Sequence, residues 1–298
     1  MGRIAAFSPA VRTLDESVRR ARIVEDHGYE SLWTTQLPNA RDASLVLAAY
    51  AAATQRVKLG TGVLPIYTRH PTAMVQMAAT IDELSGGRFI LGIGVSHRVT
   101  VESMWGLRLE SPVDAMREYL TIVRESVQTG ACNFDGKFFS AHWAYSGPRR
   151  QDLPIMISAL NPRMLELAGE LADGVVLYMC PPRYIADEVI PRVSAGREKA
   201  GKPLDGFEVV AAIDACATGD RAAALATYQG TLDRYSALPF YRKAMEAGEF
   251  NPDVLAAIGD PDQVRDAIVR YRDAGVTVPC VGPFGGKFEE TIAAAADD

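Results

Sequence analysis

The chain has 298 residues, of which 48% are hydrophobic and 23% charged, and its formal net charge is −6. This composition is typical of a globular protein with a sizeable core. The acidic balance, without basic clusters, argues against a general nucleic-acid or membrane-surface binder. Four scattered cysteines without a CxxC pair are expected to be reduced thiols of a cytoplasmic protein. Neither a secretory signal nor an apolar run long enough to span a bilayer is evident.

Short apolar runs alternate with segments of helical periodicity along the whole chain. In the first part, the pattern predicts strands at 2–8, 30–35, 57–63 and 88–95, and helices at 14–26, 42–53 and 71–84. In the second part, it predicts strands at 153–159, 175–180, 207–215 and 276–281, and helices at 112–129, 161–172, 182–200 and 260–274. Eight such alternations favour a parallel eight-stranded (β/α)8 TIM barrel over a doubly wound open sheet.

Three segments do not fit the simple alternation and are expected to be insertions in a single domain of residues 1–298. They are residues 96–111, residues 131–150, where 134–140 predict a small hairpin, and residues 220–250. The last of these is helical but is interrupted by Pro239 and Gly248.

The stretch from Lys58 to His97 indicates where a ligand would bind, because both of its strands end in glycine-bearing sequence. Gly92 to His97 begins like a dinucleotide fingerprint but lacks its third glycine, so a phosphate cradle is a weak interpretation. Gly92 and Gly94 could let a flat ligand approach the backbone, or they could allow close packing against the neighbouring strand. The predicted strand at 57–63 is interrupted after Thr61, and this interruption could be a plain bulge or a non-proline cis peptide.

The segment Ser158 to Arg163 runs from a strand end into a helix that begins at Asn161 and Pro162. Ordinary capping explains these residues, and an anion site at the helix N-terminus explains them equally. His70 and His97 lie at the carboxyl ends of neighbouring predicted strands, where a histidine could transfer a proton. No spacing of His, Asp, Glu or Cys indicates a metal site, and no GxSxG motif indicates a hydrolase.

Three motifs resemble the bacterial luciferase-like superfamily: TGVLPIYTRHP, LSGGRFILGIGVSH and PIMISALNPRMLELAGELADGVVL. The chain is most similar to the branch that uses the deazaflavin coenzyme F420, and the resemblance covers nearly its whole length. It implies a barrel with the deazaflavin ring across the carboxyl ends of the strands. It also implies a homodimer, a small-molecule substrate and a separate F420 or flavin reductase.

The resemblance implies specific cofactor contacts. A non-proline cis peptide at Gly62-Val63 would lie against the ring, Thr35 and Gln36 would contact its polar edge, and Gly94, Val95 and Ser96 would line it. The loop of Ser158, Ala159, Leu160, Asn161 and Arg163 would receive the phosphate, with Gly174 and Val175 beside it.

The catalytic pattern departs from well-known members of the branch. Leu37 stands where several have a histidine, His97 stands where several have an acid, and no acid follows the first strand. We therefore hypothesise that His97 is the proton donor or the substrate anchor of an F420-dependent oxidoreductase. Two alternatives are an FMN-dependent, two-component monooxygenase and a non-catalytic flavin-binding protein.

Overall fold

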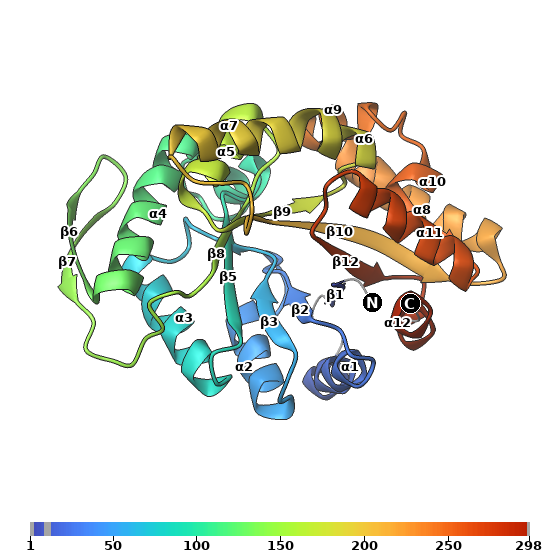
Figure 1. The fold of residues 1–298 in the computed structure, drawn as a ribbon, viewed down its shortest axis with the longest axis horizontal. Helices are drawn as coiled ribbons and strands as arrows, with labels where there is room; N and C mark the ends of the chain where they lie inside the picture. Colours follow the sequence, from blue (N-terminus) through green and yellow to red (C-terminus); the bar gives the residue numbers. More distant parts are fainter. Residues whose placement is uncertain (1–2, 9–12, 297–298) are drawn as a thin grey trace.

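Eight parallel strands close into a ring in the computed structural model, which describes residues 3–8 and 13–296 (Figure 1). Their order is β1-β2-β3-β5-β8-β9-β10-β12, and β12 pairs with β1 to close the barrel. The bounds are β1 (Ala5–Phe7), β2 (Ser31–Thr34), β3 (Lys58–Thr61), β5 (Phe89–Gly94), β8 (Ile155–Ser158), β9 (Gly174–Tyr178), β10 (Glu208–Ala217) and β12 (Val278–Pro283). Each predicted strand overlaps one of these, so the predicted TIM barrel is confirmed.

Helices pack around the ring and cover its outer face (Figure 1). They are α1 (Leu14–Asp26), α2 (Ala43–Ala53), α3 (Pro71–Leu84), α4 (Pro112–Thr129), α5 (Pro162–Leu171), α6 (Pro182–Tyr184), α7 (Ile190–Lys199), α11 (Pro261–Asp273) and α12 (Phe288–Ala296). Side-chain caps fix several helix starts, because they bind amides that lack a partner within the helix: Thr13 caps α1, and Asp260 forms a capping box with Gln263 at α11.

The barrel interior is a packed core rather than a channel. Its buried members are Ala5, Trp33, Ile90, Met156, Val210, Val278 and Cys280. Trp33 is its largest side chain, and its indole nitrogen donates to Ser31 Oγ at 2.9 Å. A Cβ at Gly60 would lie 2.5 Å from the Trp33 ring, so the neighbouring strand leaves room for the indole by carrying glycine.

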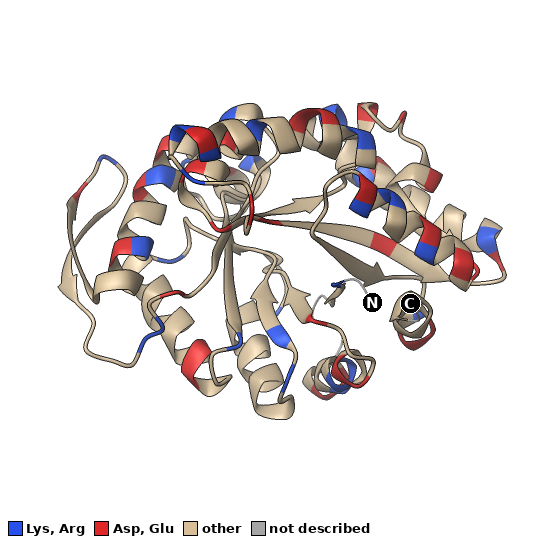
Figure 2. Cartoon of the chain, in the orientation of Figure 1, with Lys and Arg blue, Asp and Glu red and all other residues tan. Residues whose placement is uncertain are grey.

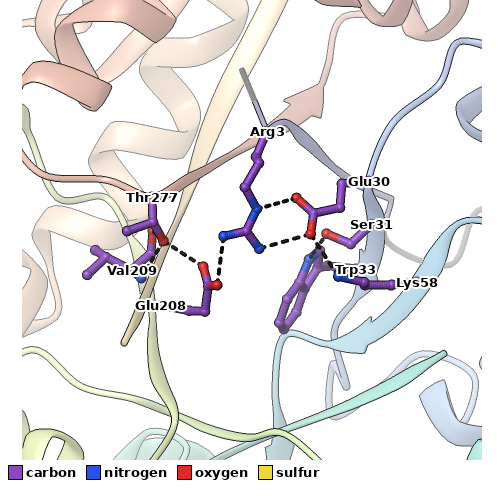
Figure 3. Close-up of polar contacts among 8 residues, drawn as sticks. All are labelled: Arg3, Glu30, Ser31, Trp33, Lys58, Glu208, Val209 and Thr277. Atoms are coloured by element: carbon purple, nitrogen blue, oxygen red, sulfur yellow. Dashed lines mark hydrogen bonds and ion pairs between the residues drawn. The ribbon is translucent and has the colours of Figure 1, made fainter. Parts of the chain in front are cut away.

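A polar network covers the amino-terminal end of the barrel, which we call the floor (Figure 3). Arg3 binds both carboxylate oxygens of Glu30, at 2.6 and 2.9 Å, and its third nitrogen contacts Glu208 at 2.7 Å. Lys58 contacts Glu30 at 2.9 Å, and the Thr277 hydroxyl donates to Glu208 at 2.7 Å. These residues precede or begin β1, β2, β3, β10 and β12, so the network ties one end of the ring together. This end of a TIM barrel usually contributes to the stability of the fold and not to catalysis.

Three segments depart from the simple alternation of strand and helix. Residues 131–150 contain the hairpin of β6 (Ala131–Asp135) and β7 (Ser140–Ala144), which lies beside α4 (Figure 1). Residues 96–111 include one π-helix, η1 (Val99–Met104), and a second, η2 (Ile185–Val189), joins α6 to α7.

The third insertion is larger than predicted. It comprises α8 (Arg221–Ser236), α9 (Pro239–Glu246) and α10 (Pro252–Leu255), and it leads into a ninth parallel strand, β11 (Ala256–Gly259), which pairs with the end of β10. The two-residue strand β4 (Leu64–Pro65) follows β3 and also pairs with β5.

Two further expectations concern cysteines and membranes. All four cysteines are buried free thiols, as predicted. Within residues 3–8 and 13–296, no helix combines the length and apolar character needed to cross a membrane.

Candidate active site

The carboxyl ends of the barrel strands meet at the end opposite the floor, which we call the mouth, and most predicted site residues lie there. Thr35 and Gln36 follow β2, Gly62 and Val63 follow β3, residues 94–97 end β5, and residues 158–161 end β8. These four strands are consecutive in the ring, so residues far apart in sequence come together along one side of the mouth.

A bulge between β3 and β4 forms part of this side, and its Gly62–Val63 peptide is cis, at the position that the resemblance implied. The Gly62 amide donates to the Thr34 carbonyl at 2.7 Å, and the Gln36 amide donates to the Val63 carbonyl at 3.4 Å. On its other side the Ile66 amide donates to the Gly94 carbonyl at 3.0 Å. The bulge is therefore tied to both neighbouring strands.

Packing of this bulge explains the two glycines of β5. A Cβ at Gly92 would lie 1.9 Å from the Thr61 carbonyl oxygen, and one at Gly94 would lie 2.6 Å from a Val63 methyl and 2.4 Å from Ser158 Oγ. The Thr61 hydroxyl accepts from the Gly92 amide at 2.6 Å and donates to its carbonyl at 2.7 Å. Of the two interpretations left open by the sequence, the structure supports strand packing, with the bulge as the packed group.

Gln36 is occupied within its own loop. Its amide nitrogen donates to the Leu37 carbonyl at 3.0 Å, and its side-chain oxygen accepts from the Ala43 amide at 2.9 Å. The side chain thus fixes the start of α2, while its backbone amide supports the bulge. These contacts occupy the Gln36 side chain and its backbone amide within the loop and the bulge.

The segment after β8 leads directly into α5. Asn161 caps the helix by accepting from the Met164 amide at 3.0 Å, and the Leu160 carbonyl accepts from the Tyr184 hydroxyl at 2.6 Å. Arg163 is largely exposed and lies 3.7 Å from Asp114. Capping is therefore present as predicted, and the guanidinium of Arg163 remains accessible beside the helix N-terminus.

Gly174 and Val175 do not lie with the other predicted cofactor residues. They begin β9, at the amino-terminal end of that strand, and Val175 is fully buried. A Cβ at Gly174 would lie 2.6 Å from the carbonyl oxygen of Glu208, which is a floor residue, and 3.1 Å from Met156 Sδ. This part of the predicted set is therefore corrected: Gly174 is glycine because β9 and β10 approach closely there.

His97 lies at the mouth after β5, with its ring 5.6 Å from the ring of Tyr241 in α9. Its ring nitrogens have no hydrogen-bond partner among the residues that the structure describes. Burial lowers the pKa of His97 below its usual 6.5, so the imidazole is neutral at pH 7.

The other three histidines have local structural roles. His70 caps α3 and contacts the Ser140 carbonyl at 3.1 Å, His27 contacts the Ile23 carbonyl at 2.8 Å, and His142 contacts Asp135 at 3.0 Å. The proton-transfer interpretation of His70 is not supported by these contacts.

The sequence analysis missed an acidic group at the mouth. Asp214 lies in β10 and accepts a hydrogen bond from the Tyr178 hydroxyl of β9 at 2.8 Å. Figure 2 shows charged residues mainly on the outer helices and loops, with acidic segments in the long strand β10. A charged residue inside an otherwise apolar strand, as in residues 207–215, is the signal that could have identified it.

Aromatic side chains from the third insertion cover this part of the mouth, and we call Tyr178, Tyr228, Tyr235 and Tyr241 the tyrosine cluster. Ring centroids are 4.9 Å apart for Tyr178 and Tyr235, and 5.0 Å apart for Tyr235 and Tyr241. They belong to, or pack against, a separate small core in which Met179, Cys216, Met245 and Ile258 are buried. The insertion is therefore a lid of packed helices over β9 and β10.

This arrangement defines a class of protein: a parallel (β/α)8 enzyme-type barrel whose polar and aromatic residues converge at the carboxyl ends of the strands. The family model of the luciferase-like monooxygenases matches residues 2–278, and the chain belongs to that family.

Similar proteins share the fold and much of the sequence. A 5,10-methylenetetrahydromethanopterin reductase of Methanolobus tindarius is 30% identical over an alignment 302 positions long, and this alignment covers 91% of each chain. The corresponding protein of Archaeoglobus fulgidus is 38% identical over 192 residues, so that alignment spans 64% of this chain and 57% of the relative. The structure of the coenzyme F420-dependent tetrahydromethanopterin reductase of Methanopyrus kandleri has a TM-score of 0.85 and 26% identity, and covers 99% of this chain and 97% of that one.

Proposed function

We propose that this protein is an oxidoreductase that uses coenzyme F420 to transfer a hydride to or from a small organic molecule. The observation that carries the proposal is similarity in fold over nearly the whole chain to an F420-dependent reductase. When bound, F420 supplies the hydride chemistry at C5 of its deazaflavin ring.

Residues of the mouth fit a ligand with a flat ring and an anionic chain. Tyr67, just beyond β4, has a hydroxyl group that is shielded from solvent and has no partner in the described part of the chain. Further along the same side of the mouth, the accessible Arg163 lies beside the positive end of the α5 dipole, where an anion is favoured. A bound cofactor would provide a partner for the Tyr67 hydroxyl and a further anionic contact for Arg163, which lies 3.7 Å from Asp114.

We assign the cofactor-binding role to the residues that meet at the mouth. They are Thr35, Gln36, Gly62, Val63, Gly94, Val95, Ser96, Ser158, Ala159, Leu160, Asn161 and Arg163. His97 lies among them, and we assign it the role of proton donor or substrate anchor. Gly174 and Val175 are left out for the geometric reason given above.

The alternative is an FMN-dependent monooxygenase supplied with reduced flavin by a separate reductase, because the family model is named for such enzymes. Oxygen dependence separates the two. Conversion of a substrate coupled to F420 fluorescence under nitrogen supports the proposal. Conversion that requires both reduced FMN and oxygen supports the alternative. The deazaflavin has carbon at position 5 and does not readily form the oxygen adduct that a flavin monooxygenase uses.

We also propose that the chain is a cytoplasmic homodimer whose F420 is reduced by a separate enzyme. Sedimentation of the purified protein measures the oligomeric state directly, and a monomer across the micromolar range would contradict the dimer.

A further inference from the structure

Asp214 points into the barrel at the mouth. A Cβ at Gly282 of β12 would lie 3.5 Å from one Asp214 carboxylate oxygen and 3.7 Å from Phe7 Cβ, and Phe7 packs on the barrel-interior core. The absence of a side chain at Gly282 thus leaves one face of the carboxyl group uncovered by β12. The carboxyl group is enclosed by the barrel and still borders the mouth.

Asp214 forms no ion pair among the described residues, unlike Asp82 and Glu30. Asp82 pairs with Arg150 at 2.8 Å, and Glu30 pairs with Arg3 and Lys58. In the described part of the chain, no cation lies within ion-pair distance of Asp214. Its carboxylate accepts a hydrogen bond from the neutral Tyr178 hydroxyl at 2.8 Å. Enclosing an acid without an ion-pair partner costs stability.

The ionisable groups around Asp214 come from several elements. They are Tyr178 of β9, Tyr228, Arg234 and Tyr235 of α8, and Tyr271 of α11. Burial raises the pKa of the Asp214 carboxyl to about 6, and the Tyr178 and Tyr228 hydroxyls and the Arg234 charge oppose this rise only in part. The acid is therefore present in both protonation states near neutral pH, as a general acid or base requires.

Asp214 also faces the residues already placed at the mouth. In the closed ring β3 and β10 are the third and seventh of eight strands, so the Gly62–Val63 bulge and Asp214 lie on opposite sides. The ring of Tyr178 is 6.3 Å from that of Tyr241, which in turn is 5.6 Å from the His97 ring. Contacts between aromatic rings thus connect the tyrosine cluster beside Asp214 to His97.

We propose that Asp214, oriented by Tyr178, is the acid that exchanges a proton with the substrate, an inference that rests on the proposed function. In the reductive direction, a carbon of a substrate double bond gains hydride from the reduced cofactor. The π-electron pair moves to the neighbouring atom, and that atom takes the proton of Asp214. The carboxylate then regains a proton from water. His97, neutral at pH 7, is left with the role of substrate anchor.

Infrared difference spectroscopy tests the protonation state without a substrate. The carbonyl stretch of the protonated acid is followed from pH 4 to 8 in wild type, Asp214→Asn, Tyr178→Phe and the control Tyr119→Phe, a buried tyrosine of α4. We expect a component with a midpoint near 6 that is lost in Asp214→Asn. Since Tyr178 donates to the carboxylate, Tyr178→Phe shifts the midpoint upward, whereas Tyr119→Phe leaves it unchanged. A midpoint near 4, or one insensitive to Tyr178→Phe, overturns the proposal even if Asp214→Asn does not fold.

Addition of F420 distinguishes a site residue from a structural one. We expect F420 to shift the midpoint of wild type further upward, because a ring over the mouth excludes water from the carboxyl group. The affinity of Asp214→Asn for F420 should stay within threefold of wild type. F420 binding without any change in the Asp214 signal overturns this inference alone. Failure of wild type to bind F420 overturns the proposed function and the inference with it.

Discussion

The backbone of Gly92 lies against the carbonyl oxygen of Thr61, and this contact decides how the bulge sits on β5. The added Cβ of Gly92→Ala would meet a backbone atom at 1.9 Å, which no side-chain rotation relieves. We expect a loss of about 3 kcal/mol in the free energy of unfolding. Gly230→Ala in α8 is the matched control, because nothing lies within 4 Å of its Cβ. Helix propensity should make it more stable by about 0.5–1 kcal/mol. Urea unfolding measures both, and equal effects would contradict the packing explanation.

His97 is the residue for which turnover and cofactor binding are expected to separate. Its ring lies beside Tyr241, and the bulge and the α5 loop come from other strands. His97→Ala should therefore lower turnover by about 100-fold or more while F420 affinity stays within a few-fold. Steady-state kinetics and fluorescence titration give the two quantities. Wild-type turnover in this variant would remove His97 from the mechanism.

At the scale of elements, Glu170 ties three helices of the outer layer together. From α5 it binds Arg117 of α4 with two contacts, one at 2.8 Å, and Lys199 of α7 at 3.0 Å. The hydrogen bonds from Arg117 lower the pKa of the Glu170 carboxyl to about 2. Because the pKa of Glu170 is lower in the folded protein than its usual 4.5, the ionised carboxylate stabilises the fold at pH values above 4.5. This stabilisation is lost as the pH falls from about 5 toward 2 and the carboxylate is protonated.

Glu170→Gln should accordingly cost about 1 kcal/mol at pH 7, and this cost should shrink toward zero between pH 5 and 2. Glu166→Gln, one turn earlier in α5 and paired with the half-exposed Arg192, is the control and should change stability little at either pH. Chemical denaturation at several pH values provides the test. A cost for Glu170→Gln that does not depend on pH would show that charge is not its origin.

Elements of the barrel were predictable from the sequence, but the additional strand β11 was not. Strands such as residues 88–95 are apolar on both faces because core and helices cover them, and this pattern is visible in sequence. Pro239 and Gly248 marked the breaks between α8, α9 and α10. β11 was missed because the run Ala256-Ala257-Ile258-Gly259 is short and contains a single strand-forming residue, Ile258.

The candidate site was predicted where a motif carried it and missed where contacts across the barrel create it. The cis peptide at Gly62–Val63 and the Asn161 cap follow from local sequence and resemblance. Asp214 and its tyrosines come from β9, β10 and α8, and only the closed ring brings them together. Gly174 and Val175 were assigned through the resemblance alone, although the strand predicted at 175–180 already begins there.

At the scale of the whole molecule, the floor and the mouth are separate ends of the barrel, and we propose that residues 1–298 fold as one domain. Arg3→Met leaves Glu30 and Glu208 without their shared cation (Figure 3). We expect a single unfolding transition with about 1 kcal/mol less stability and unchanged F420 affinity, because the floor is remote from the mouth. Calorimetry with a parallel F420 titration is the measurement. Weaker F420 binding at unchanged stability would contradict this separation of roles.

The central claim is that the mouth of this barrel binds a deazaflavin. Titration of the purified protein with F420 and with FMN, each oxidised and reduced, tests it most directly through fluorescence or calorimetry. The account predicts selective binding of F420 at micromolar concentration. Selective binding of reduced FMN would place the protein with the monooxygenases, and binding of neither would mean that the fold is present without the proposed chemistry.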